Sequence, residues 1–478
     1  MGAMLVRHFF TTTTAHGGRA IRGLAFQTRG QQGRLWTRDR RQCSDVAHKA
    51  DDGCGMRRIH HEAAATSTGV GKPPAPSPYL RTKCGDNAGE ELEAQALDMD
   101  QPYPTRTDDG YHTLSFYSFF EMTEQTVGAL RDRMQTEWGA SNSSIVSDKP
   151  KDTLGVVGRI YVCGEGINAQ LSVPTQNTRA LRQWIETDRT LRGRIPRFNW
   201  AIEHRKAFKA LHVRARPLVA SGAHVDMATL RHEPEYLDPD QWDHELQAMK
   251  EADSGTEHAP LVVDMRNSYE ARIGRFEGAV CPDTDTFRDE LDAVRSMSPD
   301  KKRPILMYCT GGIRCSVAGA VLRADGYETV KTLAGGVIAY GRHVRARPAG
   351  AAPSLFHGKN FTFDKRLGEP VTEHVLAECD QCGSPCDAFT NCANTSCNLL
   401  FIQCADCAEK HHRTCGSSLC IERASMTHEQ LIANRMGPLW DYRSRIHPEK
   451  VFGRDWIARV EKLAAAAAAA AQSKQNGS

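Results

Sequence analysis

The sequence lacks several features that would assign it to large classes of proteins. No run of about 18 or more apolar residues occurs in its 478 residues, so we expect no membrane-spanning helix and no membrane partner. We also find no secretory signal peptide, because the apolar residues after Met4 are followed at once by Arg7 and His8. The formal net charge is only +3, which is too small to indicate nucleic-acid binding without a clustered basic face. The mean hydropathy of -0.50 is low, and we therefore expect long disordered segments.

The first residues are also poor in acidic side chains. No Asp or Glu precedes Asp39, whereas arginine recurs among Thr, Ala and Gly. This composition is typical of an organellar transit peptide. We therefore predict that residues 1–110 form a disordered arm with a candidate transit peptide. A mitochondrial or other organellar location is the first hypothesis, and the cytoplasm is the alternative.

Two segments have the periodicity of folded domains. Between residues 111 and 222 the pattern predicts strand, helix, strand, strand, helix and strand, which is the order of a ferredoxin-like α+β sandwich. Glu165 and Asn168 are expected in a turn between its middle strands. Between residues 245 and 348, apolar strands alternate with helices, which predicts an α/β domain with a parallel sheet.

A cysteine follows one of these apolar strands. Cys309 would lie at the carboxyl edge of the sheet, where open α/β folds place their sites. Two glycines after it let successive backbone amides turn inward, and a helix begins beyond them. Such a loop binds anions and lowers the pKa of its thiol, so we expect Cys309 to be the most acidic and most exposed thiol. The predicted catalytic residues are Cys309 and Arg314, and the predicted anion- and substrate-binding loop consists of Thr310, Gly311, Gly312 and Ile313.

Other residues near this loop have competing interpretations. Cys315 either resolves a persulfide on Cys309 as a disulfide or simply packs at the start of the helix. Asp264 and Arg266 are expected to brace the sheet edge. The thiols of Cys163 and Cys281 are expected to stay neutral, because their settings are apolar or at a strand edge.

The motifs around Cys309 resemble those of the rhodanese family, whose loop cysteine carries sulfane sulfur as a persulfide. Five segments narrow the resemblance: SFY at 115–117, GEGINAQ at 164–170, DMRN at 264–267, YCTGGIRC at 308–315 and GKNFTFD at 358–364. In this order, and with a cysteine-rich end, they resemble the bacterial tRNA uridine hydroxylase family over roughly residues 113 to 420. The resemblance implies an acylphosphatase-like sandwich and 5-hydroxylation of the wobble uridine of tRNA with molecular oxygen as cosubstrate.

Nine of the 16 cysteines lie between residues 379 and 420. In the absence of a signal peptide, we interpret them as reduced thiols in a zinc-binding module at residues 356–422. Two Cys-x2-Cys pairs can share one tetrahedral zinc, and two Cys-x4-Cys pairs can form a second site, which leaves Cys386 over. The predicted zinc ligands are Cys379, Cys382, Cys404 and Cys407 for the first site, and Cys392, Cys397, Cys415 and Cys420 for the second.

Residues 423–478 are predicted to form a polar tail that ends in an alanine run without an apolar stripe to dock. The tail contains basic and aromatic residues that could contact RNA or form a solvated helix face. They are Arg435, Trp440, Tyr442, Arg443 and Arg445.

Three functional hypotheses follow. The first is a tRNA-modifying hydroxylase, with tRNA as its partner. The second is a sulfurtransferase that carries a persulfide on Cys309 and receives sulfur from a donor. The third is a zinc-bearing adaptor without activity. We find no flavin or NAD fingerprint in the sequence, so oxygen chemistry would start either from addition of the Cys309 thiolate to C6 of uracil or from a persulfide relay.

Overall fold

The computed structural model describes residues 109–139, 153–216, 225–251, 259–284, 287–434, 436–453 and 455–475. Residues 1–108 of the predicted N-terminal arm and Arg435 lie outside the described residues. Within the described ranges, no helix has the length and apolar character needed to cross a membrane.

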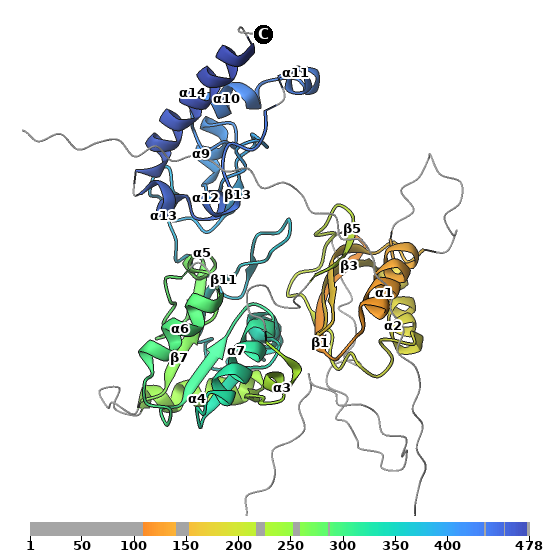
Figure 1. Cartoon of the computed structure of the whole chain (residues 1–478). Coiled ribbons are helices and arrows are strands. Elements are labelled where there is room, and N and C mark those ends of the chain that lie inside the picture. Colours follow the sequence, from red (N-terminus) through yellow and green to blue (C-terminus); the bar gives the residue numbers. More distant parts are fainter. Residues whose placement is uncertain are drawn as a thin grey trace, which may run out of the picture. The chain divides into compact units, whose positions relative to one another are not determined.

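Residues 109–216, the sandwich domain, form a five-stranded sheet with two α-helices (Figure 1). The strand order β4-β1-β3-β2-β5 is antiparallel except for the β2–β5 pair, which confirms the predicted ferredoxin-like sandwich. Its elements are β1 (Tyr111–Phe119), α1 (Glu124–Glu137), β2 (Val157–Cys163), β3 (Gly166–Pro174), a 3-10 turn (Thr175–Asn177), α2 (Thr178–Thr187), β4 (Asn199–Trp200) and β5 (Leu211–Ala215).

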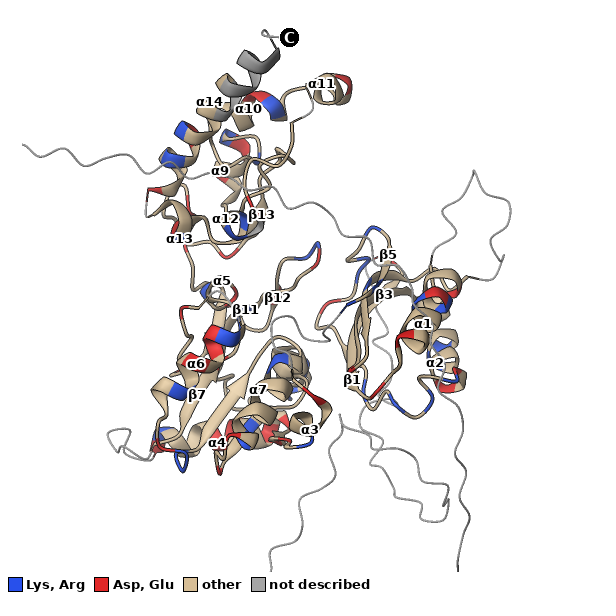
Figure 2. Ribbon diagram, viewed as in Figure 1, with Lys and Arg blue, Asp and Glu red and all other residues tan. Residues whose placement is uncertain are grey.

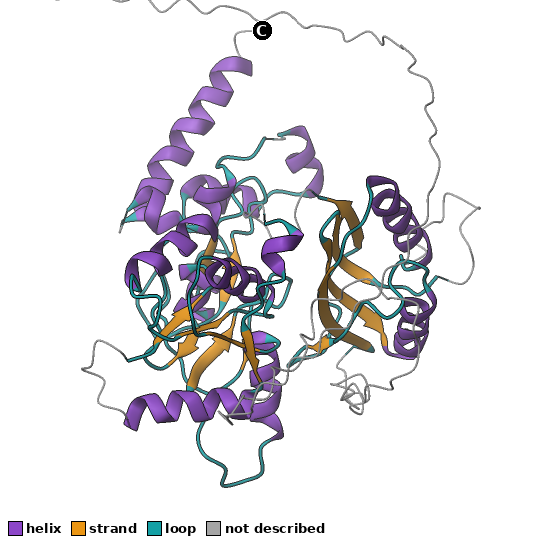
Figure 3. Ribbon diagram, turned by 60° about the horizontal axis from the view of Figure 1, so that its bottom comes forward, coloured by secondary structure: helices purple, strands orange, loops and turns teal. Residues whose placement is uncertain are grey.

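The two helices cover one face of this sheet, as Figure 3 also shows. Alternate strand residues such as Ile160 and Leu171 pack there against Leu130 and Met134 of α1. The turn between β2 and β3 is shorter than we expected. Asn168 lies inside β3, paired with Tyr161, because the two strands continue to Cys163 and Gly166.

Residues 225–370, the α/β domain, contain a parallel sheet with the order β6-β10-β9-β7. The small sheet β12-β11-β8 extends this domain. The strands are β6 (Glu235–Leu237), β7 (Leu261–Asp264), β8 (Gly274–Phe276), β9 (Ile305–Tyr308), β10 (Val330–Leu333), β11 (Phe356–Asn360) and β12 (Glu369–Pro370). The helices are α3 (Met227–Leu230), α4 (Pro239–Glu251), α5 (Ser268–Arg272), α6 (Phe287–Met297), α7 (Ile313–Ala324) and α8 (Gly336–Ala346).

Two strands outside the predicted range 245–348 pair with the strands of this domain. Strand β6 joins the parallel sheet although it precedes residue 245. Strand β11 pairs with β8 and so connects residues 356–360 of the predicted zinc module to the α/β domain. Both strands are too short, at three and five residues, to show a clear periodicity.

Residues 377–475, the cysteine module, contain one short hairpin and six helices in the part that the structure describes. The hairpin is formed by β13 (Phe389–Asn391) and β14 (Leu400–Ile402). The helices are α9 (Ala405–Lys410), α10 (Ser418–Ala424), α11 (His428–Ala433), α12 (Tyr442–Ile446), α13 (Pro448–Phe452) and α14 (Trp456–Gln475).

The tail is not the solvated appendage that we expected. Trp456, Val460 and Ala464 are buried at intervals of four residues along α14. Trp456 and Val460 share a core with four of the predicted zinc ligands. The apolar stripe was missed because it begins at Trp456 and Val460, before the alanine run, and reaches that run only at Ala464.

Candidate active site and metal centres

Cys309 directly follows β9, and the loop of residues 309–314 turns from this strand into α7. Gly312 has a φ of +98°, which favours glycine, and its backbone amide donates a hydrogen bond to Cys309 Sγ at 3.1 Å. The thiol is only 1% exposed. Our expectation of an exposed thiol is therefore wrong, because the loop folds over its own cysteine.

Electrostatics nevertheless favour the thiolate. Burial raises the pKa of Cys309, but a hydrogen bond from Cys315, the charge of Arg314 and the backbone amides of Cys315 and Gly312 outweigh it and lower this pKa to about 6. Burial and the nearby Cys309 raise the pKa of Cys315 well above its usual value. At neutral pH the two residues therefore form a thiolate and a thiol that donates to it.

The carboxylate of Glu270 in α5 accepts hydrogen bonds from the guanidinium of Arg314. The two parallel hydrogen bonds measure 2.7 and 3.0 Å, and the Thr310 hydroxyl donates to the same carboxylate at 2.9 Å. Glu270 is fully buried; burial raises the pKa of its carboxyl, but Arg314 and Arg266 reverse the sign and lower it. Arg314 thus fixes the loop through Glu270, while its charge also acts on the Cys309 thiol within the loop that we predicted to bind anions. The sequence alone gave no partner for Arg314.

Asp264 and Arg266 form a buried ion pair at the same sheet edge. The hydrogen bonds from Arg266 to Asp264 measure 2.8 and 2.6 Å, and the Tyr308 hydroxyl donates to Asp264 at 2.8 Å. Arg266 Nη2 also donates to the carbonyl of Gly274 in β8 at 2.7 Å. These contacts join β7, β8 and β9, as expected for a brace beneath the loop.

Glu290 of α6 was not anticipated as part of this environment. Its side chain is buried with a residue exposure of 6%, and its Oε1 atom has no hydrogen-bond partner. Burial raises the pKa of Glu290 well above its usual value; Arg314 opposes this, while Asp264, Glu270 and Cys309 add to it. The surroundings of Glu290 therefore favour the neutral form of this buried carboxyl group. The sequence signal was an acid at a helical position between the apolar residues Phe287, Leu291 and Val294.

The sandwich domain contacts the helices on either side of the Cys309 loop, at Ser316 of α7 and at Gly335 before α8. The Tyr117 hydroxyl lies 2.9 Å from Ser316 Oγ, and Asn199 Nδ2 donates to the carbonyl of Gly335 at 2.7 Å. Tyr117 also belongs to the same hydrophobic core as Cys309 and Cys315. Strands β1 and β4 therefore approach the carboxyl edge of the parallel sheet, where the reactive thiol lies.

The eight predicted zinc ligands come together in two groups of four. In each group, the sulfur atoms all lie within 4.8 Å of one another. Cys386 belongs to neither group. The groups consist of Cys379, Cys382, Cys404 and Cys407, and of Cys392, Cys397, Cys415 and Cys420.

The geometry of both groups fits a tetrahedral metal ion. Four sulfur atoms at about 2.3 Å from a zinc ion would lie about 3.8 Å apart. The measured separation is 3.6 Å between Cys382 and Cys404, and 4.0 Å between Cys397 and Cys415. The Trp440 indole N–H donates to Cys397 Sγ at 3.4 Å, which further favours a thiolate. The two groups can each hold a metal ion through four thiolates.

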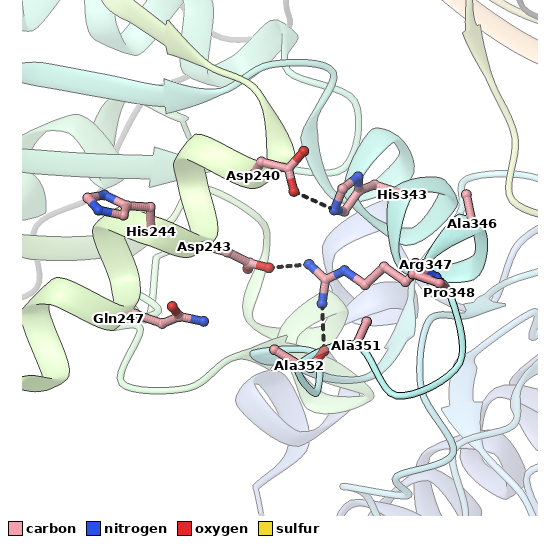
Figure 4. Close-up of a pocket in the computed structure, with 10 residues that line it drawn as sticks. All are labelled: Asp240, Asp243, His244, Gln247, His343, Ala346, Arg347, Pro348, Ala351 and Ala352. Atoms are coloured by element: carbon pink, nitrogen blue, oxygen red, sulfur yellow. Dashed lines mark hydrogen bonds and ion pairs between the residues drawn. The ribbon is translucent and has the colours of Figure 1, made fainter.

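Among the cavities lined by described residues are two whose walls do not include Cys309. The larger, of about 430 Å³, lies at α4 and α8, where Asp243 pairs with Arg347 and Asp240 with His343 (Figure 4). Its charges are thus already paired. The smaller cavity, of about 230 Å³, includes Phe363, whose ring lies 5.9 Å from the Arg314 guanidinium. This second cavity therefore adjoins the residue that ends the Cys309 loop.

Three family models match the chain. They describe an acylphosphatase-like domain at residues 111–219, a rhodanese-like domain at 244–343 and a rhodanese C-terminal region at 357–421. A tRNA uridine(34) hydroxylase of Erwinia tasmaniensis is 38% identical over 357 residues, covering 73% of this chain and 90% of the relative. The chain belongs to the tRNA uridine(34) hydroxylase family.

Members from Yersinia pestis have the same 38% identity over 353 residues, with 89% of their length covered. Among solved structures, a rhodanese-like domain from Anabaena is 26% identical, covers 26% of this chain and 89% of that domain, and has a TM-score of 0.19. The membership of the tRNA uridine(34) hydroxylase family rests on the relatives from Erwinia tasmaniensis and Yersinia pestis, of which 90% and 89% of the length is covered.

Proposed function

We propose that this chain hydroxylates C5 of the wobble uridine of a tRNA, with Cys309 as the nucleophile. The observation that carries the proposal is the similarity to tRNA uridine(34) hydroxylases along about nine-tenths of their length. The buried, acidic thiol of Cys309 supports it, because a thiolate at neutral pH can add to C6 of uracil. That addition makes C5 electron-rich enough to react with molecular oxygen.

The electron balance gives Cys315 a role. Conversion of C5–H to C5–OH by molecular oxygen, with reduction of the second oxygen atom to water, consumes two electrons and two protons. Two thiols that become a disulfide release two electrons and two protons. Cys309 and Cys315, which are hydrogen-bonded and both buried, are placed to supply them once Cys309 has left C6. Uridine, molecular oxygen and two thiols thus give 5-hydroxyuridine, water and one disulfide.

Zinc is proposed as the metal of both four-cysteine groups, in a structural role. Four thiolates with no open position are the usual donor set of structural zinc. The module also contains little apolar material apart from the residues that surround the cysteines, so metal binding and folding would be coupled.

Sulfur transfer is the second candidate function. The observation that favours it is the hydrogen bond from the Gly312 backbone amide to Cys309 Sγ, since such amides can also stabilise the negative charge of a persulfide. However, Glu270 offsets the charge of Arg314, which a donor anion such as thiosulfate would need. Hydroxylation is therefore the better-supported function.

The test uses a bacterial strain that lacks 5-hydroxyuridine in its tRNA. Expression of this chain should restore the modified nucleoside, measured by mass spectrometry, whereas Cys309→Ser should not restore it. Brisk transfer of sulfur from thiosulfate to cyanide without any change in tRNA would favour the sulfurtransferase instead. Absence of both activities from the wild-type chain would favour the adaptor hypothesis.

The acid-poor, arginine-rich first residues support import into an organelle. A fluorescent protein fused after residue 110 should then accumulate in mitochondria or another organelle. Uniform cytoplasmic fluorescence would contradict this proposal.

A further inference from the structure

The face of the five-stranded sheet that is turned away from α1 and α2 carries polar, basic and aromatic side chains. Two rows cross it, because residues paired across neighbouring strands point to the same side of a sheet. One row contains His212, Arg159, Gln170, Ser115 and Asn199, and the other contains Arg214, Tyr161, Asn168 and Tyr117. We call this surface the open face.

Exposure on the open face changes from one edge of the sheet to the other. Arg159, His212 and Arg214 are exposed at the β5 side, and Tyr161 is half-buried beside them. At the β1 side, Tyr117 is buried and its hydroxyl contacts Ser316 in the helix that follows Cys309. The two rows therefore run from a solvent-exposed basic edge to the immediate neighbourhood of the reactive thiol.

The charge of this face has one sign. None of the described residues that point to it from β1 to β5 is acidic, and Arg216 just beyond β5 lies 5.5 Å from the ring of Tyr161. Figure 2 shows Lys and Arg in blue along β5 and the adjacent loops. Arginine beside an aromatic ring on an open sheet is suited to a phosphate backbone with unpaired bases, because the ring can stack on a base while the guanidinium meets a phosphate.

The smaller cavity continues this surface. Arg159 lines it together with Phe363, Asn391, Asn398 and Arg445. Phe363 lies against Arg314, so the cavity connects the exposed edge of the open face with the end of the Cys309 loop. Its volume of about 230 Å³ is below the range of typical drug-sized ligand pockets, but a flat base can enter it edge-on or partly.

We propose that the open face holds an unpaired RNA loop, with Arg159 and Arg214 on phosphates and Tyr161 stacked on a base, and guides one nucleotide to Cys309. This inference rests on the proposed function, since it names the surface by which the same active site would receive its RNA. Unpaired RNA is the chosen partner because addition to C6 of uracil requires a base that has left its stack.

The first test measures binding of a fluorescent stem–loop RNA with a uridine-rich loop to the full-length chain. Arg159→Glu with Arg214→Glu should weaken binding roughly tenfold or more, and the slope of log K against log salt should become shallower by about 1.4, or about 0.7 per lost phosphate contact. The matched control is Arg131→Glu with Arg179→Glu, which makes the same charge change on the helix-covered side of the sandwich domain. The control should bind within about twofold of the wild type.

The second test concerns stacking. Tyr161→Ala should weaken loop binding about 5- to 150-fold, whereas Tyr161→Phe keeps the ring and should bind like the wild type. Equal losses for both variants would overturn the stacking assignment. A fully paired RNA that binds as tightly as the loop would overturn the inference. Polyglutamate that binds the chain more tightly than the stem–loop RNA, and loses this binding in Arg159→Glu with Arg214→Glu, would also overturn it and would indicate an acidic protein partner.

The inference and the proposed function can fail separately. In one outcome the wild-type chain restores 5-hydroxyuridine, but the variant with reversed charges on the open face binds and reacts like its control. This result would refute RNA binding by the open face and would leave the proposed hydroxylase activity standing. In the other outcome the RNA loop binds in a manner that depends on Arg159 and Arg214, but the chain never hydroxylates tRNA. This result would refute the hydroxylase activity and would leave RNA binding by the open face standing. Alkylation of Cys309, which needs no RNA, should be equal in all these variants and reports an intact loop.

Discussion

The thiol of Cys309 should titrate near pH 6, and Cys315 should be one reason. At pH 7, a pKa of about 6 makes about nine-tenths of the thiol ionised, compared with about 3% for an ordinary cysteine with a pKa of about 8.5. A hydrogen bond to a charged group contributes about 1.5–3 kcal/mol, and one pKa unit corresponds to 1.36 kcal/mol. Cys315→Ala should therefore raise the midpoint by about 1–2 units and slow alkylation at pH 7 about 2- to 10-fold.

The assay is the rate of labelling by a small neutral alkylating reagent between pH 5 and 10, followed by peptide mass spectrometry. Burial slows the absolute rate but leaves the midpoint readable. Cys315→Ser, which keeps a donor, should shift the midpoint less than Cys315→Ala. Burial raises the pKa of Cys163 to about 11 and of Cys281 to about 12, so these thiols should stay unlabelled below pH 9. A wild-type midpoint above pH 8, or one that Cys315→Ala leaves in place, would refute the electrostatic reasoning.

Four further predictions concern metal and stability. Elemental analysis of reduced protein should find two zinc ions per chain; Cys382→Ser should lose one, and Cys386→Ser should keep both. Arg266→Met should destabilise the α/β domain by about 3–5 kcal/mol in a denaturant titration, because it leaves Asp264 buried without its partner; a loss below about 1 kcal/mol would contradict this. The pKa of Glu290 is raised in the folded protein, so neutral Glu290 stabilises the fold relative to the ionised form. This stabilisation is fully present below the pKa of the unfolded state and is lost as the pH rises through the pKa of the folded state. Glu290→Gln should therefore gain thermal stability relative to the wild type as the pH increases. Trp456→Ala should destabilise the cysteine module by about 3–5 kcal/mol and leave Cys309 alkylation unchanged; unaltered melting would show that α14 does not dock.

The sequence predicted the features that depend on local pattern. The 309–314 loop needs only a strand, two glycines and a helix start within a few residues, and the cysteine groups follow from repeated spacings of two and four. Metal ligands also have few alternatives, because sulfur atoms of one site must meet within a few ångströms. These features could be derived without knowing how distant segments pack.

Features that depend on distant contacts were missed. Glu270 meets Arg314 across 44 positions, and its role in fixing the loop is visible only once α5 and α7 are placed. The contact of Tyr117 with Ser316 joins residues 199 positions apart. Burial of Cys309 is another such effect, since a Gly-rich loop can open outward or close over its thiol with the same sequence. Glu290 shows the same limit, because periodicity alone cannot distinguish a buried acid with a raised pKa from an exposed acid with an ordinary one.

The two four-cysteine groups differ in their access to solvent. Cys382 is exposed in the first group, whereas all four sulfur-bearing residues of the second are buried beneath Trp440, Phe452 and Trp456. Metal bound to the second group can therefore leave only when the C-terminal helices open. A chelator could attack the first metal at the exposed Cys382 without unfolding of the module, whereas it could reach the second metal only after local unfolding. Loss of metal from the module would accordingly be stepwise and kinetically ordered, and removal of the first ion alone would yield a half-loaded protein that persists long enough to isolate.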